Sequence, residues 1–207
     1  MQSTDQNIDA IPEAKINKQN LLEKFQAFLP DNAVLHDAED LRPYECDGLS
    51  AYRKVPMIVV LAATIEQVQK VIKLCYVYDV PVVARGAGTG LSGGALPLEK
   101  GVLLSLAKFK SILDINPLAR TARVQPGVRN LAISDAAKAF GLYYAPAPSS
   151  HIACTIVGNV AENSGGVHCL KYGLTVHNIL DLKIVTIEGD LRTIGGQTLA
   201  SPGYDLL

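Results

Sequence analysis

The residues with the clearest chemical potential form a glycine-rich stretch, Arg85 to Ala95, with the sequence RGAGTGLSGGA. Its five glycines directly follow an apolar run, residues 80–84. Glycine permits backbone conformations in which successive N–H groups point inward and form an anion-binding concavity. Arg85, Thr89 and Ser92 add side-chain donors for phosphate oxygens. We therefore expect a phosphate-binding loop, and the alternative is a tight strand connection that uses glycine only for its turns.

Gly88, Gly90 and Gly93 match the GxGxxG spacing of a Rossmann dinucleotide site, but the context argues against that fold. The Rossmann pattern must open a helix. Here only residues 94–101, with a proline at position 97, separate the pattern from the next apolar run. A P-loop is excluded as well, because no Gly-Lys-Ser/Thr follows at the required spacing.

Two later segments, residues 146–150 and 155–166, again combine small residues with side-chain donors. Such residues suit the close passage of a flat polar ring. Together with a phosphate loop, they predict a long cofactor that lies between two lobes.

The elements that must position these segments alternate between strands and helices, which indicates an α+β fold. Residues 64–67 have the form of a capping box and open a helix between two apolar strands, a βαβ unit that ends at the glycine loop. A second lobe with a mixed sheet follows. The expected helices cover residues 17–29, 64–75 and 127–140, and the expected strands cover 57–62, 80–84, 102–106, 112–115, 120–125, 179–187 and 191–194.

The composition favours a protein that handles a small molecule. The 207 residues carry a formal net charge of -1, so neither a nucleic acid nor an anionic membrane surface is expected as a partner. No run is apolar enough for a signal peptide or a membrane span, which predicts a cytoplasmic protein that reaches a membrane only through partners. The four cysteines lack zinc-like spacing, so we expect reduced thiols and no metal site.

Four longer phrases resemble the FAD-binding PCMH-type domain of the vanillyl-alcohol oxidase and p-cresol methylhydroxylase superfamily. The resemblance is strongest to its branch of FAD-linked glycolate oxidase subunits and D-lactate and D-2-hydroxyglutarate dehydrogenases, and it extends from about residue 20 to the end. The phrases are PYECDGLSAYR (43–53), RGAGTGLSGGALPLEKGVL (85–103), VQPGVRNLAIS (124–134) and NVAENSGGVHCLKYGLTVHN (159–178).

The resemblance implies FAD as the cofactor and assigns residues to its two ends. Those implied to wrap the pyrophosphate are Arg85, Gly86, Ala87, Gly88, Thr89, Gly90, Ser92 and Gly93. Those implied to line the ribityl chain and the flavin ring are Pro148, Ser149, Thr155, Val157, Gly158, Asn159, Glu162, Asn163, Gly165, Gly166, Tyr172 and Gly173.

Several of these assignments have alternatives. Arg85 could instead form a salt bridge within its loop, Glu162 could cap a backbone group, and Tyr172 could be a core tyrosine. Val157 stands where the family usually has glycine, and a β-branched residue does not easily adopt a positive φ. We therefore expect Val157→Gly to tighten FAD binding.

The resemblance also implies an activity and partners. A small 2-hydroxy acid, glycolate or D-lactate, would be oxidised to the 2-oxo acid by hydride transfer to flavin N5, and electrons would pass to partner subunits that include an iron-sulfur subunit. Because the family continues into a substrate-cap domain, the catalytic residues are expected beyond Leu207. The expected organisation is a tail and helical segment, 1–52, followed by an incomplete FAD-binding domain, 53–207. The alternatives are a nucleotide-binding module without turnover and a fragment that binds nothing.

Overall fold

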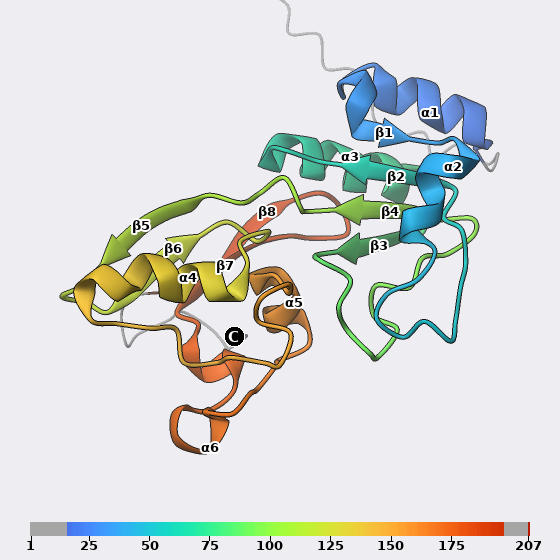
Figure 1. Cartoon of the computed structure of the whole chain (residues 1–207). Helices are drawn as coiled ribbons and strands as arrows, with labels where there is room; N and C mark the ends of the chain where they lie inside the picture. The colour runs from blue at the N-terminus through green and yellow to red at the C-terminus, as the bar shows by residue number, and fades with distance from the viewer. Residues whose placement is uncertain (1–15, 197–206) are drawn as a thin grey trace, which may run out of the picture.

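The computed structural model describes residues 16–196 and residue 207, and its first half is built on a four-stranded sheet (Figure 1). The strand order is β1-β2-β4-β3; β1 is antiparallel to β2, and the other strands are parallel. β4 lies between the two strands of the predicted βαβ unit, so that these strands are not neighbours. The strands are β1 Val34–Leu35, β2 Ile58–Leu61, β3 Val82–Arg85 and β4 Val102–Ser105.

Two helices, α1 Lys18–Gln26 and α3 Ile65–Val77, pack on one face of this sheet. The predicted start of α3 is confirmed: Thr64 Oγ1 accepts from the Gln67 N–H, and Gln67 Oε1 accepts from the N–H of Ala63. The two helices and the alternate residues of β2 and β4 share one core, which contains Leu21, Phe25, Ile58, Val60, Val71, Val102 and Leu104.

The other face of the sheet is covered more thinly. There Leu41 of the short helix α2, Ala38–Leu41, packs against Val59 and Leu103. Single-turn 3-10 helices flank this region at Asp31–Ala33 and Arg42–Tyr44. The chain then runs from the 3-10 helix Arg42–Tyr44 to β2 as a long irregular segment that carries most of the phrase at residues 43–53.

The second half combines helices with two antiparallel strand pairs. β5 Ile112–Asn116 pairs with β6 Thr121–Val124, and β7 Asp181–Val185 pairs with β8 Leu191–Gly195. The α+β class is confirmed, but the expected single mixed sheet is wrong, because no backbone pairing joins the two hairpins among the described residues. They approach through side chains, where Arg123 Nη2 lies 3.6 Å from Asp181 Oδ2.

Helix α4, Asn130–Ala137, begins three residues later than expected. The preceding residues pair instead with a later segment: the Ile156 and Val157 N–H groups donate to the carbonyls of Val128 and Pro126. A 3-10 turn, Lys138–Phe140, continues α4 and ends, as predicted, at Gly141, whose φ is 69°. Three short helices complete this half: α5 Ile156–Ala161, α6 Cys169–Tyr172 and the 3-10 helix Thr175–Asn178.

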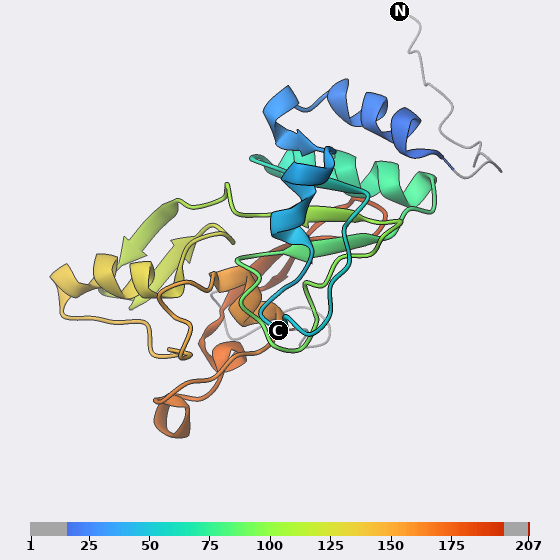
Figure 2. The same ribbon diagram turned by 45° about the vertical axis from the view of Figure 1, so that its right-hand side comes forward.

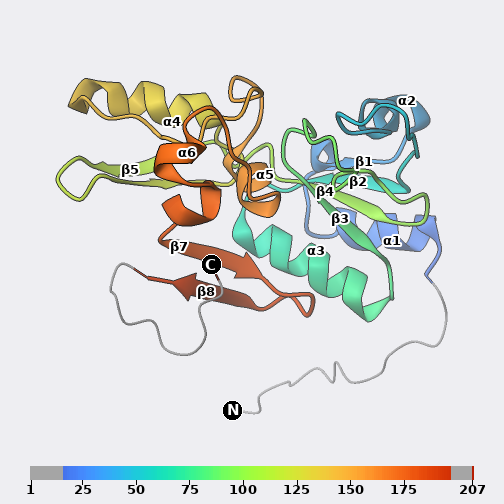
Figure 3. The same cartoon turned by 90° about the horizontal axis from the view of Figure 1, so that it is seen from below.

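The β7–β8 hairpin returns to α3 and joins the two halves of the molecule (Figure 3). At its turn, the Gly189 carbonyl accepts from Gln69 Nε2 at 2.9 Å. A Cβ on Gly189 would lie 2.9 Å from both the Gln69 carbonyl oxygen and Lys73 Cβ, and Gly189 has a φ of 87°. This turn therefore requires glycine both for its backbone and for the close contact.

The predicted division at residue 52 stays a prediction, although Leu21 and Phe25 of α1 share a core with Ile58 and Val60 of β2. Residues 1–15, in the predicted N-terminal tail, lie outside the described residues. Residues 197–206, which precede the last residue of the chain, lie outside them as well. Within the described part of the chain, no helix combines the length and apolarity needed to cross a bilayer.

Candidate functional site

The glycine loop after β3 lies directly against helix α5, so that two segments far apart in the sequence meet. A Cβ built on Gly86 would lie 2.3 Å from Thr155 Oγ1 and 3.0 Å from Val157 Cγ1. Farther along the loop, a Cβ on Gly94 would lie 2.5 Å from Glu162 Oε1. Only a residue without a side chain allows the loop this approach at Gly86, and the fold thus brings the predicted phosphate loop to the second donor-rich segment.

The third segment, residues 146–149, lies next to Gly166, which follows α5 in the chain. A Cβ on Gly166 would lie 2.1 Å from the Ala147 carbonyl oxygen and 2.9 Å from the Pro148 nitrogen. The Pro148 carbonyl accepts from the His151 N–H at 2.9 Å, which closes a turn there. Pro148 and Gly166 are therefore neighbours, as their assignment to one end of a cofactor requires.

Three glycines of these segments face open space. A Cβ on Gly90, Gly93 or Gly158 would meet no heavy atom within 4 Å. Gly93 also has a φ of 77°. Thr155 Oγ1, which packs against Gly86, is buried and has no hydrogen-bond partner within the protein. Open glycine backbone fits a phosphate-bearing ligand that approaches the main chain closely.

Arg85 is buried and turns its guanidinium into the protein. Nη1 donates to the Cys46 carbonyl at 2.8 Å and to the Ala95 carbonyl at 3.4 Å. Burial lowers the pKa of the guanidinium, and the nearby Asp47 carboxylate opposes that effect. The observed partners are backbone carbonyls rather than the carboxylate of a salt bridge, and contact with the pyrophosphate stays a prediction.

Asn159, expected beside the flavin, is buried in an amide network. Its Oδ1 accepts from Asn130 Nδ2 at 2.8 Å, and its Nδ2 approaches Cys154 Sγ at 3.3 Å. Asn130 Nδ2 also donates to the Pro146 carbonyl at 2.8 Å. The network ties α4, α5 and the 146–149 segment together. No sequence pattern singles out Asn130, although it lies within the phrase at residues 124–134.

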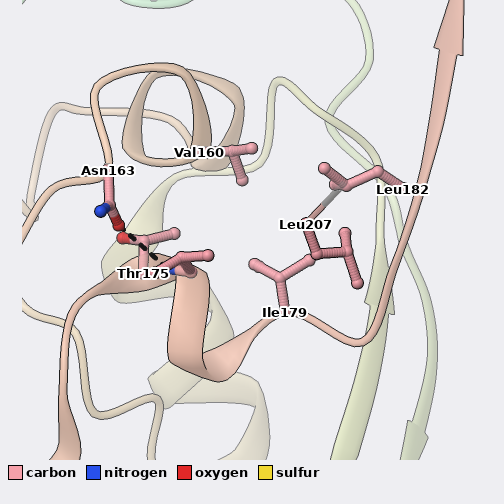
Figure 4. A pocket seen from close by; sticks show the side chains of 7 residues that line it. Val160, Asn163, Thr175, Ile179, Leu182 and Leu207 are labelled. Atoms are coloured by element: carbon pink, nitrogen blue, oxygen red, sulfur yellow. Dashed lines mark hydrogen bonds between the residues drawn. The ribbon is translucent and has the colours of Figure 1, made fainter. Parts of the chain in front are cut away.

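Asn163 and Glu162 occupy different surroundings at the end of α5. Asn163 has a φ of 46°, and its Oδ1 accepts from the Val176 N–H at 3.0 Å. It lines a cavity of about 230 Å³ between α5, the 3-10 helix at 175–178 and β7, which Leu207 also contacts (Figure 4). Among the residues that the structure describes, no ionisable side chain lines this cavity. Glu162, in contrast, lies beside the glycine loop at Gly94.

The backbone at Val157 contradicts the positive-φ argument behind the Val157→Gly expectation, whereas the effect of that exchange on FAD affinity stays a prediction. It lies in the first turn of α5, and positive φ among described non-glycine residues occurs only at Asp79, Arg120 and Asn163. The position therefore does not require the backbone freedom of glycine. Because Val157 packs against Gly86, we now expect Val157→Gly to remove a contact and weaken α5.

Tyr172 is 39% exposed and so is not a core tyrosine. Its ring makes edge contacts with Tyr143 at 6.1 Å and His168 at 6.4 Å between centroids. A hydrogen bond from Tyr143, followed by the Lys171 ammonium group, lowers the pKa of the Tyr172 hydroxyl. Gly173 follows with a φ of 79° and packs against the His177 ring.

The remaining predicted residues fall into two groups. Ala87, Ser92 and Ser149 are exposed, whereas Gly88, Thr89 and Gly165 are partly buried. All four cysteines are free thiols. Among residues 16–196 and 207, no group of three or more His, Cys, Asp or Glu side chains is arranged to hold a metal.

Comparison with known proteins identifies the family to which the chain belongs. Residues 56–195 match the FAD binding domain family. Glycolate oxidase subunit GlcD of Escherichia coli (strain K12) is 60% identical over 198 residues, which are 96% of this chain and 39% of that protein. D-lactate dehydrogenase of Anaerostipes hadrus is 34% identical over 189 residues, 90% of this chain and 39% of that protein.

A solved structure extends the comparison to three dimensions. The crystal structure of p-cresol methylhydroxylase with substrate bound matches with a TM-score of 0.71 at 28% identity, over 91% of this chain and 38% of that chain. The chain thus spans about two fifths of the length of the curated relatives described above.

Proposed function

This chain belongs to the FAD binding domain family, and from that premise we propose that its glycine loop holds the FAD pyrophosphate while α5 and the segments around Pro148 and Tyr172 line the flavin. The observation that carries the proposal is the contact between Gly86 and Thr155. It joins the two donor-rich segments and leaves Gly90, Gly93 and Gly158 facing open space. The protein would bind and orient the cofactor there through backbone N–H groups of the glycine segments.

The whole protein, we propose, oxidises a small 2-hydroxy acid such as glycolate or D-lactate to the 2-oxo acid. Bound FAD would supply the acceptor for the hydride equivalent of such a substrate, and the hydroxyl proton would pass to a base. The names of the E. coli and A. hadrus relatives support this substrate class. The described residues supply the cofactor side, and we place the catalytic groups in the part of the relatives that this chain does not cover.

The electron acceptor is proposed to be a partner subunit. Support comes from the E. coli relative, which is named a subunit of glycolate oxidase. An iron-sulfur subunit would take electrons from the reduced flavin, and attachment to a membrane would occur through such partners. No part of this proposal requires nucleic acid.

A titration of the purified chain with FAD tests the proposed function. We expect saturable quenching or enhancement of flavin fluorescence with FAD, and much weaker binding of FMN and NAD, which lack one half of FAD. Circular dichroism and a cooperative thermal transition establish that the protein used is folded. A folded chain that binds none of the three ligands would contradict the proposal.

A further inference from the structure

A segment outside the predicted site covers the glycine loop from the side opposite α5. We call residues 44–49 the strap. A Cβ on Gly48 would lie 2.7 Å from the Thr89 carbonyl oxygen and 2.8 Å from that of Gly90. Asp47 Oδ1 accepts from the Leu49 N–H at 2.9 Å, which fixes the turn of the strap at this contact. The strap and the loop after β3 run side by side in two views (Figures 1 and 2).

Arg85 joins the strap to the loop. It is the last residue of β3, and its carbonyl accepts from the Leu106 N–H at 2.9 Å, so the sheet holds its main chain in place. Its guanidinium bonds to Cys46 in the strap and to Ala95 at the far end of the loop. The Tyr44 ring centroid lies 5.8 Å from its Cζ, a distance at which a cation-π contact is favourable.

The loop itself is shaped around this side chain. A Cβ on Gly88 would lie 2.2 Å from Arg85 Nη2 and 2.4 Å from Cζ, and Gly88 has a φ of 69°. The guanidinium therefore fills the space that a side chain would occupy at position 88. A planar group with donors on several edges suits this place, whereas the single ammonium group of lysine cannot fill it in the same way.

We propose that Arg85 is a positioning residue that clamps the strap onto the glycine loop and thereby forms the pyrophosphate cradle before the cofactor arrives. A loop that is already held in its binding conformation does not have to be ordered on binding, which increases affinity. This inference rests on the proposed function. It differs from the expected role of Arg85 because the guanidinium acts through the backbone and not on the phosphate.

The test compares Arg85→Gln with Arg192→Gln, the same exchange in β8. The Arg192 side chain is 65% exposed and pairs with Asp190, outside both the strap and the glycine loop. Hydrogen exchange of residues 44–49 and 86–95 is followed in the protein without ligand, and dissociation constants are measured for FAD and ADP, which shares the pyrophosphate. Gly48→Ala should release the strap without changing Arg85. It serves as the test variant if Arg85→Gln does not fold.

For Arg85→Gln and for Gly48→Ala we expect faster exchange in both segments and about ten- to hundredfold weaker binding of FAD and ADP, the range for lost hydrogen bonds of a charged group. The loss of binding free energy in the double variant should not exceed the sum of the losses in the two single variants, because both variants release the same contact. Arg192→Gln should match the unmodified chain in every measurement.

Two outcomes overturn the clamp. Unchanged exchange in Arg85→Gln would show that the guanidinium does not hold the two segments. Faster exchange with unchanged affinity would show that the clamp exists but does not serve binding. Failure of the unmodified chain to bind FAD contradicts the proposed function instead, and the exchange measurement without ligand still decides whether Arg85 clamps the strap.

Discussion

Individual glycines in this chain differ in what they do, and the contacts around each Cα separate the roles. Gly48, Gly86 and Gly88 allow contacts within the protein, because a Cβ at any of them would overlap neighbouring atoms. Gly90 and Gly158 have free space instead. The sequence shows that all of them are glycines, but it does not distinguish the two groups.

We predict that Gly90→Ala and Gly158→Ala weaken FAD binding at least about tenfold without loss of stability. A Cβ at either position enters the space proposed for the cofactor, and alanine in α5 favours the helix by up to about 1 kcal/mol. Fluorescence titration and thermal unfolding measure the two effects.

Gly141→Ala provides the opposite control, since a φ of 69° strains alanine at a position outside the segments assigned to the cofactor. It should lower the melting temperature and leave the FAD affinity unchanged. Wild-type affinity in both Gly90→Ala and Gly158→Ala would show that the cofactor does not approach these atoms.

Cys75 is predicted to resist alkylation in the folded protein. Burial raises the pKa of its thiol from the ordinary 9.0 to about 12, so the reactive thiolate is scarce at pH 8.5. Because the folded pKa is raised, the stability from the protonated thiol is full below pH 9 and is lost as the pH rises toward 12. Mass spectrometry after iodoacetamide treatment should find Cys75 modified only in denaturant. The partly exposed Cys46 and Cys169 serve as internal comparisons, and equal labelling of Cys75 would contradict its burial.

At the scale of elements, the residues of the candidate site are held in place mainly by short segments and less by the predicted strands and helices. α5 has six residues, and three or four turns of helix are usual in globular proteins. It depends on tertiary contacts, which include the backbone bonds to residues 126–128 and the amide pair Asn130 and Asn159. This explains why local sequence pattern did not predict α5.

Asn130→Ala should lower the free energy of unfolding by about 1–3 kcal/mol, because the Pro146 carbonyl and Asn159 Oδ1 lose their buried donor. Urea denaturation followed by circular dichroism measures the change. Asn116→Ala makes the same exchange in the β5–β6 hairpin, where the lost hydrogen bond is exposed. It should lower the free energy of unfolding clearly less than Asn130→Ala does. Equal costs would show that the amide network does not support α5.

At the scale of the molecule, the two halves are joined twice, by the glycine loop on α5 and by the β7–β8 hairpin on α3. The proposed cofactor space therefore lies between parts that hold each other in place. The described residues contain no assigned catalytic group, and the relatives extend over more than twice the length of this chain.

We therefore predict that this 207-residue chain, although loaded with FAD, does not oxidise glycolate or D-lactate at a measurable rate with an artificial electron acceptor. Dye reduction followed by absorbance is the assay. Chemical reduction of the bound flavin in the same preparation shows that the cofactor can accept electrons. Robust turnover would place the catalytic residues within this chain.

The sequence alone determined the α+β class, most helix and strand positions of the first half, the helix start at Thr64 and the FAD-binding family. These features depend on local periodicity, capping and long matching phrases, which are properties of neighbouring residues. The tertiary structure decided the rest: the insertion of β4 between β2 and β3, the helical backbone at Val157, the Asn130 network and the inward guanidinium of Arg85. Each of these depends on which distant segments meet, and loop, strap and short-helix sequences carry no periodic pattern that would reveal their partners.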